Sequence, residues 1–280
     1  MTMDFPALQR IVAGVGTRGA STLCRPDFWE AAQRLLVRAS RVSIVTGFYI
    51  QKADAPETDG PPGAVVLGRA LERLGKRVVL CTDQRIYACL KACSRSAGGP
   101  TVVCADVPER VEGGADLLVF IERPGHAADG RYYDMRGTDV SSVAAPLDLA
   151  VESALIRGVP VLGIGDGGNE AGMGLLYEPL SALLPHYAPC LSRVSATVCL
   201  PVDVSNWGAY ALTAVLSAFY RRWVGLGEGE EVVLLKALAE AGAVDGVSGE
   251  RGLTVDGASL TRLDQVSHEL RRWCFDFQVR

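Results

Sequence analysis

One segment of the chain concentrates metal-binding residue types around a tight turn. In GIGDGGNEAGMG (163–174), six glycines surround Asp166, Asn169 and Glu170. Carboxylate and amide oxygens are the ligands that Mg²⁺ and Mn²⁺ prefer in proteins, so these three residues are predicted metal ligands. Simple turn formation is the alternative interpretation, because Asp and Asn also favour turns.

A second segment places two carboxylates in a rigid setting. In PETDGPPGA (56–64), Glu57 and Asp59 stand two residues apart between prolines and glycines. Proline fixes the backbone direction, and glycine lets a ligand approach the main chain. The pair is therefore a candidate for proton transfer, with a purely structural role in the turn as the alternative.

Several charged and polar side chains could contact a charged ligand. An arginine binds a carboxylate through two parallel hydrogen bonds, although most arginines form surface ion pairs instead. The candidates for contacting a substrate are Arg18, Lys52, Glu122, Arg123, Arg136 and Asn206.

The candidate residues follow apolar runs that have the character of buried strands. These runs are near-continuous and not alternating, and helical segments separate them, as is typical of a parallel sheet covered on both faces. The predicted strands are 42–48, 78–83, 101–106, 115–125, 159–170 and 195–203, and the predicted helices are 27–40, 64–75, 84–96 and 146–158.

The pattern predicts a three-layer, Rossmann-like α/β fold in one domain over residues 1–280, with a helical C-terminal portion from Asn206 onward. A glycine-rich stretch at 241–259 lies between two of the late helices and is expected to be a surface or site loop. Ligands of open parallel sheets bind at the carboxyl ends of the strands, so the loops 51–63, 122–137 and 166–170 should share one rim.

Composition excludes several classes of protein. With 280 residues, 49% hydrophobic residues and a net charge of -4, the chain is not intrinsically disordered and lacks the basic surface that nucleic acids require. No apolar run approaches the ~20 residues of a membrane span, and the N-terminus lacks a signal-peptide pattern. The eight cysteines contain no CxxC pair and are expected to be reduced thiols in a cytoplasmic protein.

Seven motifs along the chain together resemble the D-glutamate cyclase family, whose vertebrate members carry this domain at the C-terminal end of a longer mitochondrial protein. The motifs are GTRGAST (16–22), TGFYIQKADAPETDGPPGA (46–64), CTDQR (81–85), IERPGHAADGRYYDMRG (121–137), GIGDGGNEAGMG (163–174), SNWGAY (205–210) and AVDGVSGERGLTVDG (243–257).

The resemblance implies a lyase that converts D-glutamate into 5-oxo-D-proline and water. Within that reaction Glu57 and Asp59 are the predicted proton carriers, and the basic residues are the predicted ligands of the substrate carboxylates. Mg²⁺ or Mn²⁺ is the expected cofactor. The expected partners are the amino-acid substrate and, in a homodimer, a second copy of the chain, with neither nucleic acid nor a membrane.

Two other functions stay open at this stage. The GDGGNE turn is similar to the acidic turn of haloacid-dehalogenase-like phosphatases, but the first strand ends in TGFYI and not in their DxDx nucleophile loop. A non-catalytic module that binds an amino acid or another anion is the second alternative. Asp245 and Asp256, in the last of the seven motifs, have no role that the sequence alone explains.

Overall fold

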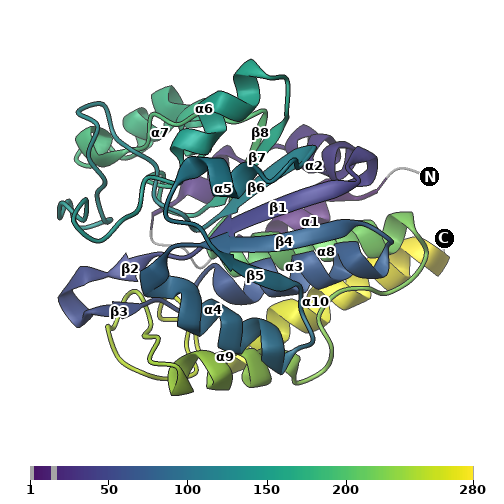
Figure 1. Cartoon of the computed structure of the whole chain (residues 1–280). Coiled ribbons are helices and arrows are strands. Elements are labelled where there is room, and N and C mark those ends of the chain that lie inside the picture. The colour runs from purple at the N-terminus through teal and green to yellow at the C-terminus, as the bar shows by residue number, and fades with distance from the viewer. Residues whose placement is uncertain (1–2, 14–17, 280) are drawn as a thin grey trace.

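A six-stranded, wholly parallel sheet forms the centre of the computed structural model, which describes residues 3–13 and 18–279 (Figure 1). The strand order is β5-β4-β1-β6-β7-β8. Counted within the sheet this is 3-2-1-4-5-6, so the winding direction reverses between β1 and β6. The predicted α/β fold is confirmed. The strands are β1 (Arg41–Thr46), β4 (Arg77–Thr82), β5 (Thr101–Cys104), β6 (Leu117–Ile121), β7 (Val161–Gly165) and β8 (Val198–Pro201).

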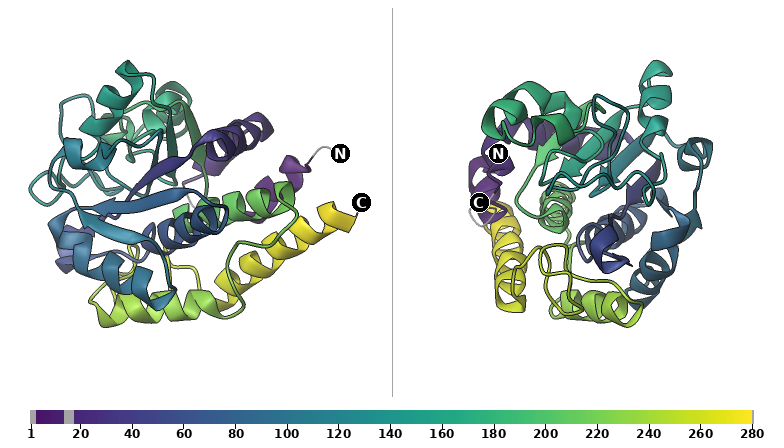
Figure 2. Two further views of the ribbon diagram at one scale, coloured as in Figure 1. Left: turned by 45° about the vertical axis from the view of Figure 1, so that its right-hand side comes forward. Right: turned by 90° about the vertical axis from the view of Figure 1, so that its left-hand side faces the viewer.

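Helices cover both faces of the sheet (Figures 1 and 2). One face carries α2 (Pro26–Arg38), α3 (Pro61–Arg73), α4 (Gln84–Ser96) and α8 (Ser205–Phe219), and outside them lie α1 (Phe5–Ile11), α9 (Glu230–Glu240) and α10 (Leu260–Val279). The other face carries α5 (Pro108–Glu112) and α6 (Leu149–Ile156), and α7 (Tyr177–Leu183) packs near β8.

Most residues of the central strands are apolar because both faces of the sheet are covered. In β1, Ile44 packs into the core under α3 and α8, whereas its neighbour Val45 packs into the core under α5 and α6. Val119 and Phe120 divide in the same way in β6. Alternate residues thus pack into the hydrophobic cores on opposite faces of the sheet. The strands therefore lack the alternation of polar and apolar residues that is typical of a sheet with one face in solvent.

Some elements differ from the sequence-based expectation. The stretch after β1 contains a short antiparallel hairpin, β2 (Tyr49–Ile50) and β3 (Ala55–Pro56), with a 3-10 turn over Gln51–Ala53 between its strands. The short helices α1, α5 and α7 lay outside the predicted helices, since each spans seven residues or fewer and carries little periodicity. Gly16 and Thr17 of the first motif lie outside the described residues.

The last helix closes the molecule against the first. Helix α10 runs along α8 and meets α1 (Figure 2). At the contact with α1, the indole nitrogen of Trp273 donates to the carbonyl oxygen of Asp4 at 2.9 Å. In the described part of the chain, none of the helices is both long and apolar enough to cross a membrane.

Gly60 lets the chain turn from the hairpin into α3 directly beneath the carboxyl end of the sheet. Its φ is +93°, and a β-carbon there would lie 2.6 Å from Oγ1 of Thr46 and 2.8 Å from Cβ of Glu122. Both the backbone conformation and the lack of space therefore exclude a side chain. The close approach holds Asp59 and Glu122 near one another.

Replacing this glycine should destabilise the protein for two separable reasons. We expect Gly60→Ala to cost about 2–4 kcal/mol, the sum of an unfavourable backbone and an overpacked neighbourhood. Gly75→Ala is the matched control, because φ is +84° there and no atom lies within 4 Å of the added methyl group. Chemical denaturation of both variants measures the difference, and equal losses would show that crowding at Gly60 has no effect.

Candidate active site

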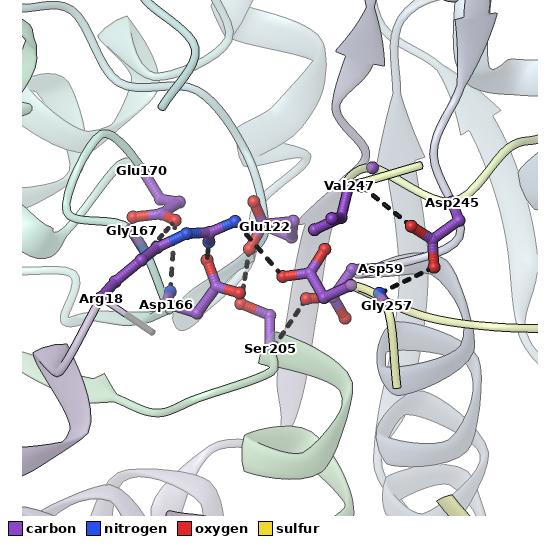
Figure 3. Close-up of polar contacts among 12 residues, drawn as sticks. Arg18, Asp59, Glu122, Asp166, Gly167, Glu170, Ser205, Asp245, Val247 and Gly257 are labelled. Atoms are coloured by element: carbon purple, nitrogen blue, oxygen red, sulfur yellow. Dashed lines mark hydrogen bonds and ion pairs between the residues drawn. The ribbon is translucent and has the colours of Figure 1, made fainter. Parts of the chain in front are cut away.

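Four buried carboxyl groups meet at the carboxyl end of the sheet, where β1, β6 and β7 stop. Figure 3 shows Asp59, Glu122 and Asp166 close together. Glu57 and Asp59 come from the loop before α3, Glu122 directly follows β6, and Asp166 directly follows β7. Oxygen atoms of Asp59, Glu122 and Asp166 lie within 4.8 Å of one another. The loops predicted to share one rim therefore converge there.

Asp59 caps the start of α8. Its Oδ1 accepts hydrogen bonds from the backbone nitrogens of Gly60 and Asn206, at 2.9 and 2.8 Å, and its Oδ2 accepts from that of Ser205 at 2.8 Å. Asn206 completes the junction, since its side chain accepts from Gly60 and Gly63 and donates to the carbonyl oxygen of Thr58. All polar atoms of the Asn206 side chain are thus engaged in holding the loop to the helix.

Glu122 occupies a strained backbone conformation. Its φ of +45° is in the left-handed region, which is uncommon for a residue with a side chain. Hydrogen bonds from its nitrogen to Ile164 and from Gly47 to its oxygen hold the main chain in place. The hydroxyl of Ser205 donates to its Oε2 at 2.6 Å. Backbone strain of this kind is frequent at functional sites, where the surrounding structure holds a residue in an unfavourable conformation.

Arg18 brings positive charge into the cluster. Its guanidinium forms an ion pair with Oδ1 of Asp166, and a second one at 3.5 Å with Asp256 from the loop before α10. The negative charge of Asp166 raises the pKa of Arg18 further above its ordinary value. Oδ2 of Asp166 has no hydrogen-bond partner among the described residues.

Glu57 is held less tightly than Asp59. Its backbone pairs with Val244, while its Oε1 is buried without a partner in the described part of the chain. A β-carbon at Gly246 would lie 2.5 Å from its Oε2 and 3.2 Å from Oδ1 of Asp256. Glu57 and Asp256 therefore face the same narrow space across a glycine that leaves room for them.

Burial shifts the acids toward their neutral forms. Loss of hydration, assisted by neighbouring carboxylates, raises the pKa values of Glu57 and Glu122 well above their ordinary range. Burial also raises the pKa of Asp166, against the opposing charge of Arg18, and raises that of Asp59 to about 8, against its three backbone donors. Acids of this kind can donate protons near neutral pH.

The predicted metal ligands occupy different environments. Glu170 accepts three backbone hydrogen bonds, from residues 166, 167 and 168, and so closes its own loop. Asn169 donates to the carbonyl oxygen of Tyr133 at 2.9 Å, and its own Oδ1 is unpartnered among the described residues. Asp166 alone belongs to the triad whose oxygens converge. The geometry favours Asp59 and Glu122 beside it, and a metal role for Asn169 and Glu170 stays a prediction.

The predicted substrate-binding cations are also dispersed. Arg123 is 1% exposed, and its guanidinium pairs with Asp83 at 2.6 Å and donates to Gly47 and Ala145, which favours a structural role. Lys52 is exposed on the turn between β2 and β3. Arg136 donates to the carbonyl oxygens of residues 246 and 247 and so links two loops above the acids. Among these candidates, Arg18 makes the direct contact with the acid cluster.

Two cavities open onto the cluster. The larger has a volume of about 390 Å³, suitable for a small metabolite, and lies between Asp166 and the start of α10. The smaller, about 40 Å³, contains Glu57, Glu122 and Asn169. Arg18 and Asp256 line both, so the two spaces form neighbouring parts of one site.

The triad of Asp59, Glu122 and Asp166 fits a hard divalent cation. All of its donors are carboxylate oxygens, the converging atoms are close enough to share an ion, and Oδ2 of Asp166 has no competing partner among the described residues. The chemistry of the donors therefore agrees with the Mg²⁺ or Mn²⁺ expected from the sequence.

Sequence reasoning gave no role to three of the site residues. Asp256 is conformationally unusual, with φ of +51°, and lies between the cavities. Asp245 organises its loop by accepting hydrogen bonds from the nitrogens of residues 247, 248 and 257 (Figure 3). Ser205 binds two of the acids. All three lie in motifs that carry the family resemblance, and their place in those motifs is the sequence feature that could have indicated them.

Comparison with known proteins identifies relatives over most of the chain. A family model described as D-glutamate cyclase-like, C-terminal, matches residues 8–271. The human protein named mitochondrial D-glutamate cyclase is 32% identical over 288 aligned positions, which cover 86% of this chain and 47% of the human protein. The chain thus spans about half the length of that relative.

A solved structure of an exopolyphosphatase-related protein from Bacteroides fragilis aligns with 91% of this chain and 62% of its own. Its sequence identity is 10% and its TM-score is 0.42. A likeness at this level carries no information about function.

The raised pKa of Glu122 should make stability depend on pH. The folded protein binds this proton more tightly than the unfolded chain, so the stabilisation is complete below the ordinary value of 4.5 and is lost as pH rises through the raised pKa. Glu122→Gln cannot titrate. Between about pH 5 and about pH 8, we expect its free energy of unfolding to fall less steeply than that of the parent, by up to about 1.4 kcal/mol per pH unit.

Denaturation in metal-free buffer at several pH values provides the measurement. Glu178→Gln, at an exposed position, is the control and should keep the slope of the parent. Identical slopes for the parent and Glu122→Gln would contradict the assigned direction of the shift.

Proposed function

The chain belongs to the family of D-glutamate cyclase-like C-terminal domains, and on this premise we propose that it converts D-glutamate into 5-oxo-D-proline and water. The observation that carries the proposal is the set of buried carboxyl groups in unequal environments beside a cavity of metabolite size. Because the chain matches about half of the human enzyme, the activity of that whole protein is carried over here as a proposal.

The reaction requires exchange of protons without net gain or loss. The ammonium nitrogen of glutamate loses two protons as it becomes the ring amide, and the departing carboxyl oxygen takes up two protons as it leaves as water. The carbon–nitrogen bond forms within one molecule, so binding in a folded conformation removes much of the entropic barrier. A site for this reaction needs one group that accepts a proton from nitrogen and one that delivers a proton to oxygen.

Glu57 is the best candidate for the proton carrier. Its Oε1 is buried and unpartnered among the described residues, and the group faces Asp256 across Gly246. A raised pKa allows it to hold a proton near neutral pH and to release it to the leaving oxygen. Asp59, by contrast, is anchored by three backbone donors, so its main contribution in the proposal is to position α8 and the acid cluster.

The proposal includes a divalent cation, Mg²⁺ or Mn²⁺, bound by Asp59, Glu122 and Asp166. When bound, such an ion polarises a substrate carboxyl oxygen and offsets the surrounding negative charge. Arg18 holds Asp166 in position through their ion pair. Ser205 fixes the direction of Glu122 through its hydroxyl group.

We extend the proposal to the cytoplasm as the compartment. All eight cysteines are free thiols, and six of them are buried. Thiols in this state are typical of a reducing environment. A homodimer also stays a prediction, which light scattering of the purified protein tests.

The activity itself is the first test. Incubation of the protein with D-glutamate and Mg²⁺ or Mn²⁺ should yield 5-oxoproline, detected by NMR, and L-glutamate provides the stereochemical comparison. Binding of D-glutamate without turnover would contradict the cyclase and favour a binding module. Release of phosphate from phosphomonoesters, with no 5-oxoproline, would favour the phosphatase.

Substitutions at Glu57 and Asp59 should have different effects. We expect Glu57→Gln to lower kcat by about 10²–10⁴-fold with little change in Tm, because a proton carrier is lost while the size of the side chain is kept. Asp59→Asn should lower Tm, because an amide NH₂ group would replace one of the two oxygens that accept hydrogen bonds from residues 60, 205 and 206. At least one backbone donor would then lose its acceptor. Glu178→Gln is the exposed control. Full activity of Glu57→Gln would remove Glu57 from the mechanism.

The metal proposal has a readout that is independent of turnover. Titration of Mn²⁺, followed by the loss of the free-ion EPR signal, should detect a bound ion whose affinity rises with pH, since the ligands must lose protons. Asp166→Asn should weaken binding by at least about 10-fold, whereas Asp276→Asn, at an exposed position, should not. A parent protein that binds no Mn²⁺ at about pH 8 would refute the site.

A further inference from the structure

Acidic and basic groups line the larger cavity together. Its carboxyl groups are those of Asp166, Asp203 and Asp256. Trp207, from the first turn of α8, and Arg262, from the first turn of α10, line the same cavity. Acceptors and donors thus face the same space of about 390 Å³.

Two donor groups near the cavity have no hydrogen-bond acceptor in the described part of the chain. The indole nitrogen of Trp207 and Nε of Arg262 are both buried, and neither has an acceptor among the described residues. Trp207 is 0% exposed, so the surrounding solvent does not satisfy its N–H group. Leaving a buried donor without a partner is unfavourable, and a suitable ligand would supply the missing hydrogen bond.

Arg262 is also electrostatically available. Its guanidinium carbon lies 5.4 Å from the centre of the Trp207 ring, which orients it, and it forms no ion pair with any described residue. Arg18, the other arginine lining the cavity, is already paired with both Asp166 and Asp256. Among the described residues that line this cavity, Arg262 is therefore the cation that remains to bind an anion.

We infer that Arg262 and Trp207 bind the α-carboxylate of an amino-acid substrate, which sets the specificity of the cavity for α-amino dicarboxylates. This inference rests on the proposed function and adds the residues that select the substrate. The α-carboxylate then lies at the start of α10, and the ammonium group faces Asp166 and Asp256. The side chain extends past Arg18 and Asp256, which line both cavities, toward Glu57 and Glu122.

The arrangement matches charge to charge along the substrate. A guanidinium and an indole N–H group donate to a carboxylate, and stacking on the ring limits the freedom of the arginine. The acids that line the cavity repel the α-carboxylate and attract the ammonium group. In the proposed orientation the γ-carboxyl group extends toward Glu57.

Binding of glutarate by calorimetry tests the inference without turnover. Glutarate has two carboxylates and no amine, so it cannot cyclise. We expect Arg262→Gln to raise its Kd by about 10–100-fold, and Arg262→Lys to raise it less. Arg272→Gln, on the exposed face of the same helix, should match the parent. Thermal unfolding of each variant shows that the fold is kept.

A substrate pair tests the same residue during catalysis. D-Isoglutamine carries an amide in place of the α-carboxylate, so the parent should prefer D-glutamate in kcat/KM, and Arg262→Gln should reduce that preference at least about 10-fold.

Unchanged glutarate affinity in folded Arg262→Gln, or no glutarate binding by the parent, would overturn the inference. Binding that depends on Arg262 without formation of 5-oxoproline would support it while refuting the proposed cyclase.

Discussion

The acidic groups at the carboxyl end of the sheet repel one another, and water that would screen them is largely excluded. Glu57, Asp59, Glu122 and Asp166 are each 6% exposed or less, and Arg18 is the cation in direct contact with the cluster among the described residues. One positive charge cannot balance them all, so part of the cluster must be protonated or must bind a cation. Both responses suit a reaction that moves protons and polarises a carboxyl group.

Several local features hold the acids close together although their charges repel. Glu122 has a left-handed backbone conformation, and only a glycine fits at position 60. The side-chain amide of Asn206 forms all of its hydrogen bonds with residues 58, 60 and 63. Asp59 is stabilised by the N-terminus of α8, where backbone donors point outward. The acids are therefore held by hydrogen bonds to the sheet edge and to helix termini.

The sequence predicts the sheet well because near-continuous apolar runs, such as 117–121 and 161–165, indicate burial on both faces. It also predicts that Glu57, Glu122 and Asp166 converge, since strand ends share one edge. The sequence does not show which of Arg18 and Arg123 contacts the acids, because both stand in motifs of the family resemblance. Arg123 is instead paired with Asp83, a contact that depends on the fold. Arg262 is not predicted from the sequence for a related reason. Its place beside the cavity depends on the packing of α10 against α8, and no local sequence pattern indicates that contact.

The start of α3 has a consequence for what the site rejects. In many sheets with this strand order, the helix after the first strand receives the phosphates of a nucleotide on its exposed backbone donors. Here Pro61 and Pro62 have no N–H groups, and those of Gly60 and Gly63 are already bound to Asn206. The carboxyl group of Asp59 occupies the same place and accepts the hydrogen bonds of residues 60, 205 and 206. The start of α3 therefore has no free backbone donor at residues 60–63 for a nucleotide phosphate.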